Sequence, residues 1–579
     1  MNQLQLPKDP TNVGLENEVV DRQRPKDPTN DELGNEVVDL FERLEQLNQI
    51  GVALSQETDI NRLLETILIA AKEITNADGG TLYRVTEERT LKFEIMRNDT
   101  LNLAMGGTTG LEIPFYPLHL YDKEGKPVTT MVAAYTVHHD QSVNIEDAYT
   151  QEGFDFSGTK NFDKKTGYRS QSFLTVPMKD HENEIIGVLQ LLNAKNRKTG
   201  DIVPFSDTDQ HLAESLASQA AIALSNRLLI NHLQNLFKSF INLINAAIDD
   251  KSPYTAGHCE RVPKLTMMLA EAVNNVKVGP LRSFSMTAKD RYELEIAGLL
   301  HDCGKVTTPV HVVDKATKLE TIFDRIRLVD TRFEVIKRDA EIELLRAKLE
   351  APANSDAQAS LKLEREFELR VREINEDREF LRFCNIGGER MNVEDQERIK
   401  TIAAKYRWYD VEGNLVEFLT ADEIENLSIR AGTLTAAERQ IINHHIEVTI
   451  QMLEALPWPK HLKNVPEYAG GHHERMDGKG YPRGLSRDQM SVQARCMGIA
   501  DIFEALTAKD RPYKKGKSLS ESLTILGKFK LNGHVDPDLF DVFIWENVYM
   551  KYAQQCMDPY QIDQVDLTKI PGYVPPPMQ

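Results

Sequence analysis

The spacing of hydrophobic positions divides the chain into segments with different periods. From about residue 40, leucine, isoleucine and valine recur every three or four positions, which is typical of amphipathic helices. Between residues 80 and 193, apolar positions instead form short strand-like runs. A further helix is expected from Ser206 or Asp207, where a short polar side chain can cap the first turn. Helix, antiparallel strands and a closing helix predict an α/β sensor domain over residues 40–226.

A long helix is expected after this domain, over residues 227–249. Its largest apolar residues follow alternating steps of four and three positions, which is heptad spacing: Leu229, Leu233, Leu236, Phe240 and Leu243. A heptad stripe this short could equally face the core of a single chain. We favour a parallel homodimer over a monomer.

Residues 321–429 are rich in charged residues at helical spacing. Two helices are predicted, from about Ile322 to Leu345 and from Phe367 to Leu381. Residues 350–358, rich in alanine, proline, asparagine and serine, are expected to form the turn between them. The segment therefore predicts a helical hairpin that projects from its domain. Its charges are expected to form a solvated face; a partner-docking arm and a lid are the alternatives.

Residues 1–39 contain an internal duplication. Pro-Lys-Asp-Pro-Thr-Asn occurs at residues 7–12 and again at 25–30, and each copy ends in Asn-Glu-Val-Val-Asp. Segments so rich in proline, aspartate and asparagine cannot bury a core, so we expect a disordered arm. A short docking motif is the alternative.

Composition narrows the class of protein. The net charge of −20 argues against a sequence-independent nucleic-acid binder, which would need a basic face. The five cysteines have no CxxC spacing, a pattern that indicates reduced thiols rather than disulfides or a zinc ribbon. No apolar run approaches the roughly 18 residues of a membrane span. We expect a cytoplasmic protein.

An apolar run that ends in the adjacent pair His301–Asp302 is the strongest chemical signal. One such pair is common without a metal, but further histidines and aspartates occur far along the chain: His258, His445, His472, His473 and Asp501. Imidazole nitrogens and a carboxylate that can bridge two cations suit a binuclear centre. Two cations about 3.5–4 Å apart can activate water and clamp the phosphate of a phosphodiester.

Over roughly residues 235–320 and 430–545, the chain resembles the HD-GYP phosphodiesterases of the HD superfamily, including the tripeptide that names the family, Gly480-Tyr481-Pro482. The resemblance implies that one metal is held by His258, His301, Asp302 and Asp501. It implies that Asp302 bridges to a second metal, completed by His445, His472 and His473. It assigns to Lys305 a role as cation or proton donor at the phosphate, and to the tripeptide the rim of the pocket. Arg511 and Lys514 would contact the other phosphate, although their segment is one residue longer than the family's usual spacing.

Some positions depart from the family or stay open. Tyr254 replaces a glutamate that helps some members to hold a third metal, which favours two divalent ions, iron or manganese before zinc. Family spacing selects His445 rather than its neighbour His444. Glu474 could orient a ligand histidine or be exposed. Three other histidines are interpreted as structural or surface residues: His211, His232 and His311.

The sensor region resembles GAF domains, including the subgroup that binds cyclic nucleotides. The likeness rests on residues 144–149, Phe154, residues 163–170 and residues 187–193. In the subgroup's split motif, Ala194 and Gln210 replace a lysine and a glutamate. The candidate ligand residues are Asp147, Thr166, Asn193, Phe205 and Asp209. A GAF fold that serves in dimerisation or binds an unknown ligand is the alternative.

Together these features predict an α+β protein: an α/β GAF domain joined by a long helix to an all-α HD-GYP domain, residues 250–320 and 430–579, that carries the hairpin. The resemblance implies hydrolysis of cyclic di-GMP, with pGpG or GMP as the final product, under control of a GAF ligand. The alternatives are a catalytically silent receptor for cyclic di-GMP or for a signalling partner at the GYP surface, and an HD phosphohydrolase for another cyclic dinucleotide.

Overall fold

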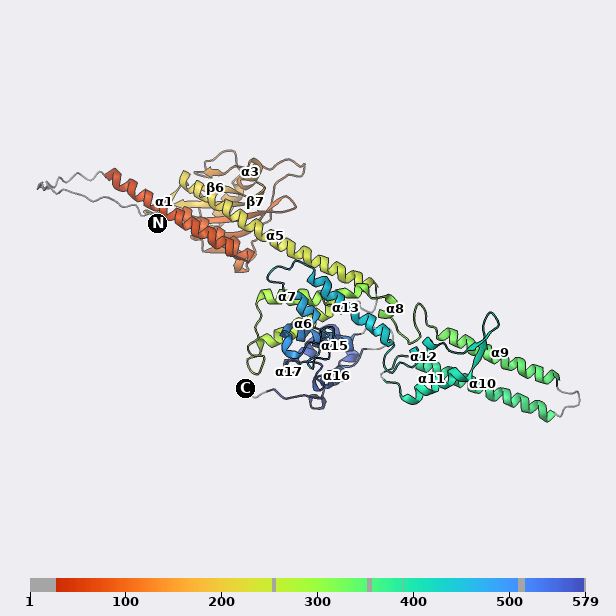
Figure 1. The fold of residues 1–579 in the computed structure, drawn as a ribbon. Helices are drawn as coiled ribbons and strands as arrows, with labels where there is room; N and C mark the ends of the chain where they lie inside the picture. The colour runs from red at the N-terminus through yellow and green to blue at the C-terminus, as the bar shows by residue number, and fades with distance from the viewer. Residues whose placement is uncertain (1–27, 252–256, 351–356, 389, 509–515, 577–579) are drawn as a thin grey trace, which may run out of the picture. The chain divides into compact units, whose positions relative to one another are not determined.

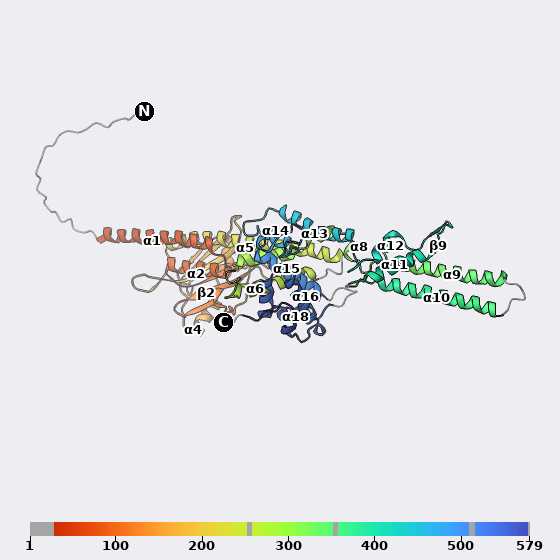
Figure 2. The same cartoon turned by 60° about the horizontal axis from the view of Figure 1, so that its bottom comes forward.

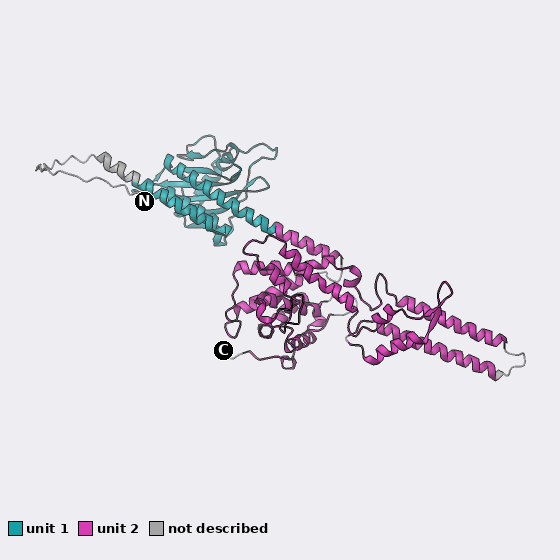
Figure 3. Cartoon of the chain, viewed as in Figure 1, with its two compact units in different colours: residues 1–235 teal, residues 236–579 magenta. Residues whose placement is uncertain are grey.

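The computed structural model describes residues 28–251, 257–350, 357–388, 390–508 and 516–576. The chain divides into two compact units, residues 1–235 and 236–579 (Figure 3). The first contains a large sheet and the second is almost entirely helical, which confirms the predicted α+β class.

The first unit is built on one antiparallel sheet with the order β3-β2-β1-β7-β6-β5, to which β4 and β8 add short edge pairs. Its strands are β1 (Ala77–Val85), β2 (Thr90–Asn98), β3 (Leu103–Gly106), β4 (Leu118–His119), β5 (Val143–Ile145), β6 (Phe173–Lys179), β7 (Ile185–Lys195) and β8 (Ile202–Val203). Leu82 lies opposite Leu189, which lies opposite Val176. Because directly opposed residues share a face, the three side chains enter one buried core.

Helices cover both faces of this sheet. The core beneath Leu82 is closed by α1 (Pro28–Gln56), α2 (Ile60–Thr75) and the first part of α5 (Asp207–Lys251). Helix α2 begins where the Asp59 side chain accepts a hydrogen bond from the Arg62 amide, and it ends at Asn76 in the left-handed conformation. The other face carries α3 (Val132–His139) and α4 (Ser157–Thr166), and η1 (Gly107–Thr109) follows β3.

Helix α1 corrects one expectation. It begins at Pro28, so residues 28–39, which we predicted to be part of a disordered arm, are helical. Proline is well suited to the first helical position, because the backbone N–H that proline lacks would have no partner there. Residues 1–27 of the predicted arm lie outside the described residues.

The helical unit surrounds one large core. Its elements outside the insertion are α6 (His258–Asn275), α7 (Ala288–Leu300), η2 (Cys303–Thr307), α8 (Val310–Val313), α13 (Ala436–Glu454), α14 (Val465–Gly470), η3 (Arg487–Gln489), α15 (Val492–Thr507), α16 (Leu519–Leu531), α17 (Pro537–Trp545), α18 (Val548–Cys556), η4 (Pro559–Gln561) and η5 (Leu567–Lys569). The predicted connecting segment is part of α5, one continuous helix of 45 residues (Figure 1). Its C-terminal part packs on α7, where Asn245 Nδ2 donates to the Leu299 carbonyl at 2.9 Å.

The insertion contains the predicted hairpin and more. Helices α9 (Ile326–Glu350) and α10 (Ala357–Asn385) lie side by side in both views (Figures 1 and 2). The chain then forms α11 (Val393–Lys405), a two-stranded hairpin of β9 (Arg407–Tyr409) and β10 (Leu415–Glu417), and α12 (Ala421–Leu427). Phe333, Tyr406 and Phe418 meet in a separate core. The segment is therefore a small subdomain rather than a bare hairpin, because α11, α12 and the strands cover the apolar base of α9 and α10.

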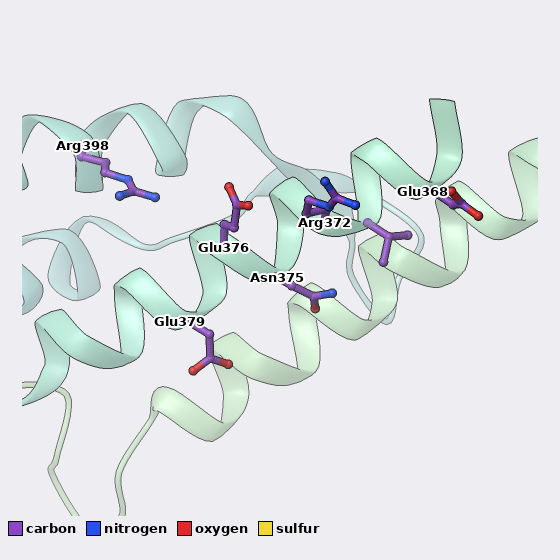
Figure 4. Close-up of a pocket in the computed structure, with 7 residues that line it drawn as sticks. Glu368, Arg372, Asn375, Glu376, Glu379 and Arg398 are labelled. Carbon is purple, nitrogen blue, oxygen red and sulfur yellow. The ribbon is translucent and has the colours of Figure 1, made fainter. Parts of the chain in front are cut away.

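A shallow depression of about 760 Å³ lies on the outside of this subdomain. Figure 4 shows Arg398 of α11 directed toward α10, whose mostly charged side chains form the rest of the surface. Arg398 stacks on Phe380, with its guanidinium carbon 4.0 Å from the ring centroid. The mixed charges agree with a solvated face.

Candidate metal centre

The structure brings the seven predicted metal ligands together from five places in the helical unit. His258 begins α6, and His301 and Asp302 connect α7 to η2. His445 lies within α13, His472 and His473 directly follow α14, and Asp501 lies on α15. The carboxylates of Asp302 and Asp501 are therefore placed among five imidazoles that are far apart in sequence.

A first group of donor atoms surrounds His258. Its Nε2 lies 3.1 Å from Asp302 Oδ2, 3.4 Å from Asp501 Oδ1 and 3.3 Å from His301 Nε2. His301 and Asp302 are almost fully buried. Atoms this close, with mixed nitrogen and oxygen donors, fit one divalent cation.

A second group consists of His445, His472 and His473, whose ligand atoms lie within 4.8 Å of one another. His445 Nε2 is 3.3 Å from His473 Nε2 and 3.2 Å from Asp302 Oδ1. Asp302 thus directs one oxygen to each group, as a bridging carboxylate must. His472 Nε2 is buried without a recorded hydrogen-bond partner in the described residues. A buried nitrogen in this condition fits a metal ligand.

In three of the five histidines, the other ring nitrogen is held by a backbone carbonyl. The Nδ1 atoms of His301, His445 and His472 lie 2.5–2.7 Å from carbonyl oxygens of their own helices, those of Gly298, Ile442 and Ala469. Such bonds fix Nδ1 as the protonated nitrogen and leave Nε2 as the ligand.

Electrostatics favour the ligating protonation states of His472 and Asp302, whereas His258 carries a proton before a metal binds. Burial and the neighbouring His301 lower the pKa of His472 to about 4, so its ring is neutral at pH 7. Burial opposes ionisation of Asp302, but Lys305 and His301 hold its pKa well below the usual range. Burial likewise opposes protonation of His258, yet hydrogen bonds with Asp302, Asp501 and Glu504 raise its pKa well above the usual value. Metal binding would displace that proton.

Lys305 lies directly beside this centre. Its Nζ donates to Asp302 Oδ2 at 2.5 Å. The backbone before it packs tightly on α13, since a Cβ on Gly304 would lie 2.0 Å from the His445 carbonyl oxygen. Only glycine allows this approach, which brings Lys305 and Asp302 to the helix that bears His445.

Glu504 is a functional position that the sequence analysis did not assign. It is buried on α15, one turn after Asp501, and its carboxylate contacts His258 Nδ1 at 2.5 Å and Arg261 Nε at 2.7 Å. It therefore orients the first-group histidine as a carboxylate partner. The spacing of three residues from Asp501 is the signal that could have revealed it.

The Gly480-Tyr481-Pro482 loop borders the second group. The Tyr481 ring stacks on His473, with centroids 4.9 Å apart, and its peptide bond to Pro482 is cis. Glu474 is neither a histidine partner nor exposed: it is buried and accepts hydrogen bonds from the Arg483 and Leu485 amides. Both earlier interpretations of Glu474 are therefore wrong, because the loop folds back over its carboxylate.

Several other predicted positions are also located. His444 is exposed and contacts Glu447, while His211, His232 and His311 are surface residues. Arg511, Lys514 and Tyr254 lie outside the described residues, so their predicted roles stay predictions.

The first unit contains a separate cavity of about 400 Å³ on the α3–α4 side of its sheet. Its walls are mainly apolar, with aromatic and aliphatic side chains, and Tyr168, Gln190 and Asn98 supply polar groups. None of the five candidate GAF ligand residues lines it. Asn193 instead bridges β7 to the segment before β6, accepting from the Gln171 and Ser172 amides. Phe205 enters the helix-covered core.

The remaining three GAF candidates have local contacts. Asp209 accepts from the Ser206 amide at the start of α5, and Thr166 Oγ1 donates to the Phe162 carbonyl. Asp147 pairs with Arg169 at 3.2 Å. These residues stabilise the fold around the cavity and do not form its wall.

Matches to family models agree with this organisation. A model described as GAF domain matches residues 59–224, and two described as HD domain match residues 255–376 and 420–539. Among solved structures, a GAF domain/HD domain protein from Geobacter sulfurreducens aligns with 30% of this chain and 98% of its own at 17% identity, with a TM-score of 0.22. No helix in the described part of the chain could cross a bilayer.

Several relatives are named as cyclic-dinucleotide phosphodiesterases. A 3′3′-cGAMP-specific phosphodiesterase of Vibrio cholerae is 45% identical over 123 residues, which is 21% of this chain and 27% of its own. Cyclic di-GMP phosphodiesterases of Pseudomonas aeruginosa and Thermotoga maritima are 36% and 31% identical over 20% and 26% of this chain. The chain spans 27% and 38% of their lengths. It therefore joins a GAF domain to an HD domain, the combination expected from the HD-GYP resemblance.

Proposed function

We propose that this chain is a metal-dependent phosphodiesterase that hydrolyses cyclic di-GMP to linear pGpG, and further to GMP if the linear product re-enters the site. The observation that supports this most directly is the shared carboxylate of Asp302, which faces both groups of histidines. The names of the relatives support the substrate class. Iron or manganese suits the mixed donors best.

The residues divide the work between them. When bound, the two cations would lower the pKa of an attacking water and neutralise phosphoryl charge. Asp302 and Asp501 balance the cation charge, and Glu504 keeps His258 in its ligating tautomer. The ammonium of Lys305 lies 2.5 Å from Asp302 Oδ2, where it can contact a phosphate oxygen or donate a proton to the departing ribose oxygen. The Tyr481 ring restricts water on the His473 side.

The function is tested by anaerobic incubation of iron- or manganese-loaded protein with cyclic di-GMP and chromatography of the products. Linear pGpG or GMP is expected. A specific observation favours a second substrate, since one relative at 45% identity is named for 3′3′-cGAMP. If only 3′3′-cGAMP is cleaved, the chain is a 3′3′-cGAMP phosphodiesterase. If metal-loaded protein cleaves neither cyclic di-GMP nor 3′3′-cGAMP, the receptor alternative replaces both enzyme functions.

We also propose that the GAF cavity binds a small regulatory ligand, with cyclic nucleotides tested first. Its volume of about 400 Å³ lies in the range of small-molecule sites. A ligand at 100 times its Kd should stabilise the unit by about 2.7 kcal/mol, which corresponds to roughly 5–10 °C in calorimetry. Gln190→Ala, in the cavity wall, should lose the shift, whereas Thr166→Ala should keep it. The absence of any shift with cAMP, cGMP or cyclic di-GMP would exclude these ligands.

A parallel homodimer through α5 completes the proposal. All five heptad residues are more than half exposed in the single chain, from 52% for Leu236 to 68% for Leu243. A heptad stripe pairs most readily with an identical stripe. Leu236→Asp should therefore convert a dimer into a monomer in light scattering, while Gln234→Asp, outside the stripe, should not. A monomeric wild type would contradict the dimer.

A further inference from the structure

A groove of about 700 Å³ adjoins the metal centre on the side of α13. One wall is α13, with Gln440, Asn443, His444 and Glu447; the others are the end of η2 and the Tyr481–Pro482 segment. These walls belong to the same elements as His445, Lys305 and the GYP loop. A substrate whose phosphate reaches the metals would extend into this groove.

The groove offers the chemistry of a base site. Ile441 and Pro482 give it apolar surface for a flat ring, and the amides of Gln440 and Asn443 can serve either edge acceptors or donors. Thr308 also lines it: that residue is 2% exposed, and its hydroxyl has no recorded partner in the part of the chain that the structure describes. A buried hydroxyl in this state is ready to bond a ligand.

Glu447 is the charged group that distinguishes bases. Its Oε2 lies 2.6 Å from His444 Nδ1, which holds the carboxylate on the groove side of α13. A carboxylate only accepts hydrogen bonds. Guanine presents two donors together, N1–H and the N2 amino group, to such a pair of oxygens. Adenine presents an acceptor at N1, which a carboxylate repels.

We infer that this groove binds one guanine of the substrate and that Glu447 is the specificity-determining residue. The inference rests on the proposed phosphodiesterase function. One guanine suffices, so both cyclic di-GMP and 3′3′-cGAMP fit the groove, and cyclic di-AMP does not. The base edge away from the sugar meets Glu447 while the sugar-phosphate stays at the metal centre.

The test compares kcat/KM for cyclic di-GMP, 3′3′-cGAMP and cyclic di-AMP in metal-loaded full-length protein. Wild type should cleave the first two at least about tenfold better than the third, since a bidentate base contact discriminates against the wrong base by about this factor or more. Glu447→Ala should narrow the ratio of cyclic di-GMP to cyclic di-AMP about tenfold, mainly through KM. Glu447→Gln, whose amide both donates and accepts, should raise turnover of cyclic di-AMP. Gln451→Ala, exposed on α13 outside the groove, is the control and should match wild type.

The outcomes separate this inference from the function on which it rests. An unchanged substrate ratio in both Glu447 variants, or a wild type that prefers cyclic di-AMP, overturns the guanine site and leaves the phosphodiesterase in place. Failure of wild type to cleave all three dinucleotides overturns the proposed function, and the guanine site with it.

Discussion

Replacing Asp302 with alanine should reduce turnover of cyclic di-GMP by about 10³-fold or more, as expected for a group on which the whole catalytic unit depends. The reason is geometric: Oδ2 lies 3.1 Å from His258 Nε2 and His301 Nε2, and Oδ1 lies 3.2 Å from His445 Nε2. The substitution removes a donor from both groups at once. Metal content, measured by mass spectrometry, should therefore fall together with activity.

The matched control for this variant is Asp488→Ala. Asp488 is an exposed aspartate of the same unit, at η3, and its loss should leave both turnover and metal content unchanged. Circular dichroism should show that both variants are folded. If Asp302→Ala keeps turnover within about tenfold of wild type, the bridging role is wrong.

The largest effect on stability is expected for Lys315→Ala. The Lys315 side chain is fully buried, and its Nζ donates at 2.8 Å to Asn426 and to both carboxylate oxygens of Glu438. Burial opposes ionisation of Glu438, but Lys315 lowers the pKa of that carboxyl. Removing one partner of a buried pair typically costs about 3–5 kcal/mol; because Glu438 is 18% exposed, we expect about 3 kcal/mol.

Tryptophan fluorescence during urea unfolding can measure this loss in the helical unit alone, because all three tryptophans of the chain, Trp408, Trp458 and Trp545, belong to it. Lys348→Ala is the control within the same insertion. Its pair with Glu364 is partly exposed on both sides and should be worth no more than about 0.5 kcal/mol. Lys315 joins the subdomain to α13, because Asn426 lies on α12 and Glu438 on α13. Equal losses of unfolding free energy in the two variants would contradict this role.

The sequence allowed the metal centre to be predicted more fully than its surroundings. The seven candidate ligand positions, which the structure brings together, lie in short motifs in family order, so each could be proposed without knowing a contact. The spacing of Glu504 from Asp501 marks its position, but its role depends on contact with His258, which is distant in sequence. Glu474 accepts hydrogen bonds from the Arg483 and Leu485 amides of a loop whose fold no periodicity predicts.

The same limit explains the two regions where prediction was incomplete. Periodicity located α9 and α10, but the core around Phe333 depends on Tyr406 and Phe418, which are distant in sequence and lie next to short strands. In the GAF domain, motif positions such as Asn193 proved to brace the backbone. The residues that line the cavity come from both strands and helical segments, which meet only in the folded unit.

The ends of the insertion have a consequence for chain topology. The Thr433 hydroxyl donates to the Lys315 carbonyl at 2.8 Å, so the chain leaves and re-enters the HD domain at adjacent points. The entropy of closing a loop depends on how its ends are brought together and only weakly on its length. A folded subdomain that holds its own ends together therefore costs the HD domain about as much loop-closure entropy as a short turn would. The helices on either side, which carry the candidate metal ligands, can keep one register while residues 321–429 change in size or sequence.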